Sequence, residues 1–151
     1  MLENKQLESL TMHDQKRIVD SLLPFLDTIP DLPSPIKFGV LHKQSVSMCV
    51  QFLKSEVQKR QDITGGYTGS LYFSIWYRFQ EADAATELYG SNVMYQINEF
   101  FDSACENNAL PVLGDDMQYL KIGMIELPTV ERKIDNMLDC MAIFECRIEH
   151  Q

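Results

Sequence analysis

The stretch SLYFSIWYRF, at positions 70–79, decides how this chain should fold. One alternating set of its positions is entirely apolar or aromatic: Leu71, Phe73, Ile75, Tyr77 and Phe79. The other set mixes Tyr72, Ser74, Trp76 and Arg78. A period of two with this many aromatic residues predicts a β-strand that packs one face against the core.

The segments on either side of this strand show helical or strand periodicity of their own. Before it, leucines and isoleucines recur at helical spacing and are followed by a proline-rich stretch. After it, a long apolar stripe at helical spacing ends at Asn107-Asn108, and two further alternating segments close the chain. The expected elements are a helix over residues 3–27, strands over 45–53 and 70–79, a helix over 81–106, and strands over 117–126 and 136–149.

This order, α-β-β-α-β-β, predicts an α+β fold. We expect a mainly antiparallel four-stranded sheet with the helices packed on it, because neighbouring strands are joined by short connections. A chain of 151 residues suits a single domain over 1–151. Within it we expect an N-terminal helix over 1–29, a Pro-rich linker over 30–44, and a sheet with a central helix over 45–149.

The second face of the predicted sheet is also rich in apolar residues, which a monomer would rarely leave in water. Two explanations are open: burial beneath the first helix, or burial against a neighbouring subunit. The candidate subunit-interface residues are Tyr72, Trp76, Arg78, Met141 and Ile143.

The charge of the chain argues against tight nucleic-acid binding. Thirteen Lys and Arg against 22 Asp and Glu give a formal net charge of −9 and a pI near 4.7. Phosphate-binding surfaces need clustered cations, and the only dense run here is Lys59-Arg60. An acidic protein can still let DNA pass without binding it specifically. No apolar stretch is long enough to span a membrane, so no membrane partner is expected.

No constellation of residues typical of catalysis or metal binding is found in the sequence. His13, His42 and His150 are not spaced to share a metal with one another or with a cysteine. Cys140 and Cys146 lie about 20 Å apart along one predicted strand, too far for a disulfide. We therefore expect no metal, no cofactor and no catalytic residue, and we expect that the chain is not an enzyme.

The segment ITGGYTGSLYFSIWYR, residues 63–78, resembles a segment of the tail terminator proteins of long-tailed phages and prophages of Gram-positive bacteria. These proteins are often labelled minor capsid or tail completion proteins. The shared pattern is a Gly-rich turn and an aromatic strand, then a long helix, a Leu-Pro pair and two closing strands. The pair here is Leu110-Pro111, and the resemblance covers roughly residues 45–149.

The resemblance implies a structural role. Such proteins form a ring, usually a hexamer, that caps the tail tube and offers the surface that docks to the filled head. The implied partners are copies of the chain itself, the tail tube protein and a head completion or neck protein. The implied location is the host cytoplasm during assembly and then the head-proximal end of the tail. We place the tube or head contact in a polar loop containing Lys54, Gln58, Lys59, Arg60, Asp62 and Tyr67.

Other functions remain open at this level. A different head–tail connector or neck protein would share the same partners. A small dimeric bacterial binding module would assemble only as a dimer. An enzyme would need a deep cleft with converging polar groups of perturbed pKa.

Overall fold

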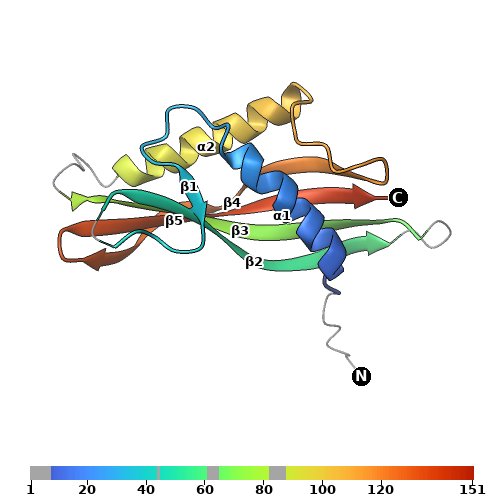
Figure 1. Cartoon of the computed structure of the whole chain (residues 1–151), viewed down its shortest axis with the longest axis horizontal. Helices are drawn as coiled ribbons and strands as arrows, with labels where there is room; N and C mark the ends of the chain where they lie inside the picture. The colour runs from blue at the N-terminus through green and yellow to red at the C-terminus, as the bar shows by residue number, and fades with distance from the viewer. Residues whose placement is uncertain (1–7, 44, 61–64, 82–87) are drawn as a thin grey trace.

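The structure is a computed structural model, and it describes residues 8–43, 45–60, 65–81 and 88–151. Within these residues two helices accompany a single five-stranded sheet (Figure 1). In chain order the elements are α1 (Met12–Leu26), β1 (Ile36–Phe38), β2 (Ser47–Arg60), β3 (Tyr67–Gln80), α2 (Leu88–Glu106), β4 (Met117–Ile134) and β5 (Met137–His150).

The strands lie in the order β1-β2-β3-β5-β4. β3 is central and pairs antiparallel with β2 on one side and with β5 on the other. α2 carries the chain from β3 to β4 at one edge, and β5 then returns between them. β1 pairs with β2 in parallel at the opposite edge, with Ile36 opposite Met48.

The predicted four-stranded, mainly antiparallel sheet in the order α-β-β-α-β-β is wrong. The sheet is five-stranded and mixed, because β1 forms inside the segment expected to be a Pro-rich linker. Pro33 and Pro35 precede β1 and so do not remove any of its hydrogen-bond donors. A strand of three residues is too short to show a period in the sequence, and Gly39, with φ of 114°, helps to turn the chain back towards β2.

β4 is longer than the sequence predicts, whereas β5 has its predicted length of 14 residues. β4 was expected to end before Pro128, yet it continues to Ile134. The strand accommodates the proline through a register shift between Glu126 and Thr129, which leaves Leu127 and Pro128 as a bulge at the sheet edge. Asp135, with φ of 53°, makes the tight turn into β5.

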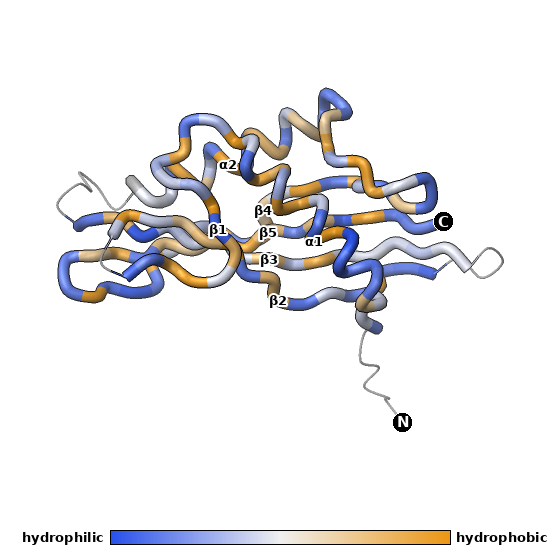
Figure 2. The backbone as a smooth tube through the Cα atoms, in the orientation of Figure 1, coloured by the Kyte–Doolittle hydropathy of each residue, from blue (hydrophilic) through white to orange (hydrophobic). Residues whose placement is uncertain are grey.

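Both helices lie on one face of the sheet. The Phe25 ring of α1 packs against the rings of Phe100 and Phe101 of α2. Phe101 in turn contacts Phe73 and Phe144 of the sheet edge-on. The alternation predicted for β3 is confirmed, since all five of its inner residues are buried. Figure 2 shows hydrophobic and hydrophilic residues interspersed along the strands of the sheet.

α1 begins later than the sequence predicts. The side-chain oxygen of Thr11 accepts a hydrogen bond from the Asp14 N–H and so caps the helix, which starts at Met12. Residues 8–11 precede the helix and are not helical, and residues 1–7 and 82–87 lie outside the described residues. α2 ends at Glu106, as the Asn107-Asn108 pair predicts, with Asn108 in the left-handed region.

Gly90 lets α2 approach the sheet closely. A Cβ atom built there would lie 2.7 Å from the Phe79 ring and 2.8 Å from the Cβ of Cys140. We expect Gly90→Ala to lower the free energy of unfolding by about 1–2 kcal/mol, because overpacking outweighs the gain in helix propensity. Urea unfolding measures this. Asn92→Ala, on the exposed side of the same helix, is the control and should be neutral or slightly stabilising.

Candidate assembly surfaces

The open face of the sheet, which is the face opposite the helices, carries all five candidate interface residues. β3 and β5 bring them together, because Trp76 pairs with Met141 and Ser74 pairs with Ile143. Each of the five is partly exposed, namely Tyr72, Trp76, Arg78, Met141 and Ile143. Their gathering on one face is as expected, and their role as a subunit interface stays a prediction.

One end of this face is held by a buried carboxylate with two arginine partners. Asp139 is buried, and its two oxygens accept hydrogen bonds from Arg78 at 2.7 and 2.8 Å. Arg132 of β4 approaches the same carboxylate at 3.1 Å and also lies over the Trp76 ring, 4.7 Å from its centroid. Fork-shaped pairing of this kind fixes orientation as well as charge, so the Arg78 side chain is held in place.

The middle of the open face is a network of hydroxyl and carboxylate groups. The Tyr72 hydroxyl donates to Glu56 at 2.5 Å, and Ser70 donates to Glu145 at 2.5 Å. Burial first, and then the hydrogen bond to Glu56, raise the pKa of Tyr72 to about 12. Tyr72 therefore acts as a neutral hydrogen-bond donor at physiological pH.

The first explanation for the apolar open face, burial beneath the N-terminal helix, is wrong. α1 lies on the other face, where Ser21 and the Tyr119 hydroxyl are 2.6 Å apart. Part of the open face is instead covered by the chain between β1 and β2. Val40 and Leu41 line a small hollow there together with Cys49 and Trp76, and Arg78 donates to the carbonyl of His42 at 3.0 Å.

The predicted tube or head contact loop is a strand over most of its length. β2 runs to Arg60, so Lys54, Gln58, Lys59 and Arg60 are exposed strand residues. The polar composition that indicated a loop instead marks a strand lying near the sheet edge. Asp62 lies outside the described residues, and Tyr67 is not on the surface.

Tyr67 belongs to a polar cluster that joins α1 to the end of the sheet where β3 begins and β5 ends. Its hydroxyl donates to the buried carboxylate of Asp14, and its ring stacks on His150 with the centroids 5.1 Å apart. Arg17 donates to both oxygens of Asp116, at 2.7 and 3.0 Å. Nothing in the sequence joins residues this far apart, so this cluster was not predicted.

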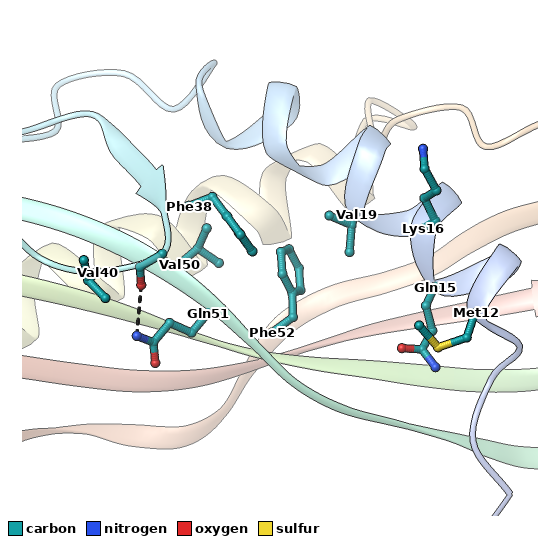
Figure 3. Close-up of a pocket in the computed structure, with 10 residues that line it drawn as sticks. Met12, Gln15, Lys16, Val19, Phe38, Val40, Val50, Gln51 and Phe52 are labelled. Atoms are coloured by element: carbon teal, nitrogen blue, oxygen red, sulfur yellow. Dashed lines mark hydrogen bonds between the residues drawn. The ribbon is translucent and has the colours of Figure 1, made fainter.

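An apolar groove lies between α1 and the β1 edge of the sheet, above β2 (Figure 3). We call it the α1–β1 groove. Its volume is about 740 Å³. The rings of Phe38 and Phe52 stand side by side with their centroids 5.9 Å apart, and Val19 points towards them from α1. The side chains of Met12, Phe38 and Val40 are 78%, 66% and 81% exposed. The groove lining is Met12, Gln15, Lys16, Val19, Phe38, Gly39, Val40, Val50, Gln51 and Phe52.

Several exposed apolar side chains lie on the opposite edge of the sheet. We call residues 125–134 of β4 the arm. It carries Ile125, Leu127, Val130 and Ile134, of which Leu127, in the bulge, is 71% exposed. Sequence reasoning missed both the groove and the arm. The one available signal for the arm was Leu127-Pro128 within an alternating segment, since proline inside a strand indicates an edge.

The described residues hold no group of three or more metal-ligating side chains. Among them, Cys49, Cys140 and Cys146 are buried free thiols, and burial raises the pKa of Cys49 and of Cys140 to about 11. Thiols of this kind are poor nucleophiles. None of the described helices has the length and apolar character needed to cross a membrane.

Removal of the buried Asp139 carboxylate should lower the free energy of unfolding far more than removal of Arg132, its more exposed partner. Asp139→Ala leaves the nearly buried Arg78 without a counter-charge, which we expect to cost about 3 kcal/mol of unfolding free energy. Arg132→Ala removes a half-exposed partner and should cost less than about 1 kcal/mol. Urea denaturation of both variants tests this, and equal losses would contradict the assigned order.

The Arg17–Asp116 pair should make the stability of the fold depend on pH in the acidic range. The hydrogen bond from Arg17 holds the pKa of Asp116 below its usual value of 3.8. The pair therefore stabilises the fold above that value, and the stabilisation is lost as the pH falls through the lowered pKa. We expect Asp116→Asn to lower the melting temperature at neutral pH and to lose this effect in strong acid. Asp115→Asn is a charge-matched control, and a constant difference at every pH would refute the linkage.

Comparisons with known proteins give a partial likeness of shape. No family model matches the chain, and no curated protein matches it in sequence. Among solved structures, a chain of the "Virion of native gene transfer agent (GTA) particle" aligns with it at 14% identity and a TM-score of 0.48. The alignment covers 87% of this chain and 97% of that chain.

Proposed function

We propose that this chain is a structural protein of a phage or prophage, and that it works as a tail terminator. In this role it forms a ring that caps the tail tube and offers a surface for docking to the head. The proposal begins from the sequence resemblance of residues 63–78, of which 67–78 lie in β3.

The observation that carries the proposal is that apolar surface lies on both edges of one sheet. Val40 is 81% exposed at the β1 edge and Leu127 is 71% exposed at the β4 edge. Water-exposed apolar clusters on a small domain mark sites of association. Two different clusters on opposite edges suit a protein that contacts a neighbour on each side, as a ring subunit does.

The polar parts of the surface support the same role. Asp139, Arg78 and Arg132 hold the open face rigid through charge-assisted hydrogen bonds, so this face offers a partner a fixed shape. The net charge of −9 favours a surface along which DNA slides without being held, because like charges repel. No covalent chemistry is needed for any of these contacts.

Electron microscopy of tails from a parent phage or prophage with this gene disrupted tests the role. Because an uncapped tube continues to add subunits, we expect tails of uncontrolled length that lack heads. Supplying the wild-type gene from a plasmid should restore tails of fixed length that are joined to heads.

Two other results would replace the proposal. Tails of normal length beside separate filled heads would place the protein in the neck. Normal virions would leave the small dimeric binding module as the better reading.

A further inference from the structure

We propose that the α1–β1 groove binds an extended segment of a partner protein, and that this segment pairs with the free edge of β2 as an added strand. The inference goes beyond the terminator role and does not depend on it. It rests on backbone groups that the described residues leave without partners, on the width of the opening, and on the side chains that line its two sides.

A stretch of β2, residues 51–54, lies between two segments that already pair with the same edge of the strand. On one side, the carbonyl of Val50 accepts a hydrogen bond from the Gly39 N–H at 3.1 Å. On the other side, the N–H of Val57 donates to the carbonyl of Glu8 at 2.6 Å. Between these two points no described residue makes a backbone hydrogen bond to this edge of β2. The edge is therefore suited to strand pairing and is open over this stretch.

Phe52 faces the opening with its backbone. Alternate residues of a strand direct their N–H and C=O groups to the same edge, so Phe52 follows Val50 in facing this edge. In a parallel ladder the Gly39 carbonyl would accept from the Phe52 N–H, but the side-chain amide of Gln51 donates to that carbonyl at 2.9 Å instead (Figure 3). The pairing with β1 therefore stops short of Phe52, whose free backbone groups are those that an added strand would use.

The width of the opening admits a single loose strand. Four residues of a strand span about 13 Å. One end of the opening is bounded by Gly39, and the other by Leu10, whose N–H donates to Ser55 Oγ at 3.1 Å. A strand that belongs to a folded sheet would bring its own neighbouring strands into these two segments, whereas a chain end or a long loop would not. The geometry therefore favours an extended segment of a partner over the sheet edge of a second copy.

The side chains around the opening indicate the chemistry of this segment. Its helix side is apolar, because Met12, Val19 and Phe38 line the groove there. On the other side, Lys54 lies on the open face with its Nζ atom 5.4 Å from the centroid of the Tyr72 ring, and it makes no ion pair with any described residue. Successive side chains of a strand point to opposite faces, so the segment should alternate apolar and polar residues and place a carboxylate beside Lys54.

A short peptide tests the site in the full chain. The probe is Val-Glu-Val-Glu-Val with acetyl and amide ends, and the chain is labelled with nitrogen-15 for NMR. Because the added strand would bond to the Phe52 N–H, we expect saturating peptide to slow hydrogen exchange at this amide at least about tenfold. The peptide Val-Val-Val-Glu-Glu has the same composition without the alternation, and we expect it to bind at least about tenfold more weakly.

Methylation of the peptide backbone tests whether binding adds a strand. In one peptide the central Val nitrogen is methylated, and in a second peptide a Glu nitrogen is methylated instead. Only one of these two N–H groups can point towards β2, and which one depends on whether the added strand runs antiparallel or parallel to β2. We therefore expect one methylated peptide to lose binding and the other to keep it.

Substitutions in the groove give a second test with matched controls. Met12→Asp places a charge on the apolar side and should weaken binding at least about tenfold, whereas Val112→Asp, at a side chain 89% exposed and outside the groove, should not. Lys54→Glu should weaken binding of the probe and favour Val-Lys-Val-Lys-Val instead. Lys121→Glu, an exposed charge-matched control on β4, should leave the preference unchanged. Since these side chains are exposed, the variants should fold, and circular dichroism checks this.

Three results would overturn the inference. The first is that none of the peptides protects the Phe52 N–H at concentrations up to about 1 mM. The second is that both methylated peptides bind as well as the probe, because the groove would then hold apolar side chains without strand pairing. The third is self-association of the wild-type chain that Met12→Asp abolishes, because a second copy would then fill the groove. None of these results bears on tail length, which tests the terminator role separately.

Discussion

The pairing of β3 on both of its sides constrains the rest of the structure. A strand hydrogen-bonded to β2 and to β5 over nearly its whole length has no freedom to shift register, because a slip of one residue would exchange its two faces. Its inner side chains therefore fix where both helices lie. Its outer side chains, with Trp76 and Arg78 among them, fix what the opposite face offers. The edges are then left to the two segments that β3 does not touch, β1 and the arm of β4.

The sequence predicts the elements whose pattern is long and strictly alternating. β3 and β5 follow such patterns, and the end of α2 follows from the Asn107-Asn108 pair, so these predictions are confirmed. β1 could not be predicted, because three residues after a run of prolines carry no period. The true end of β4 could not be predicted either, because Pro128 ends a central strand but is tolerated at a bulged edge.

The candidate surfaces were predictable only where they follow from the alternation of side chains within each strand. Trp76 and Met141 were assigned to one face by counting in steps of two, and the structure places them opposite each other. The groove is formed by α1, β1 and β2. Nothing in the sequence singles out Phe38, because its contact with Phe52 depends on the pairing of β1 with β2. Tyr67 shows the converse: a residue beside a Gly-rich turn suggested a surface position, but the contact with Asp14 draws it inward. Contacts between distant segments follow from topology, which local patterns do not encode.

Pro128 also affects how the outer edge of β4 behaves towards other chains in solution. A newly made protein can stay in the cell at high concentration for some time, and exposed strand edges then risk templating one another into insoluble fibres. The proline lacks an N–H, and the bulge around it interrupts the ladder, so a strand arriving from solution could not zip along this edge. The same feature that leaves Leu127 exposed thus opposes uncontrolled extension of the sheet at this edge.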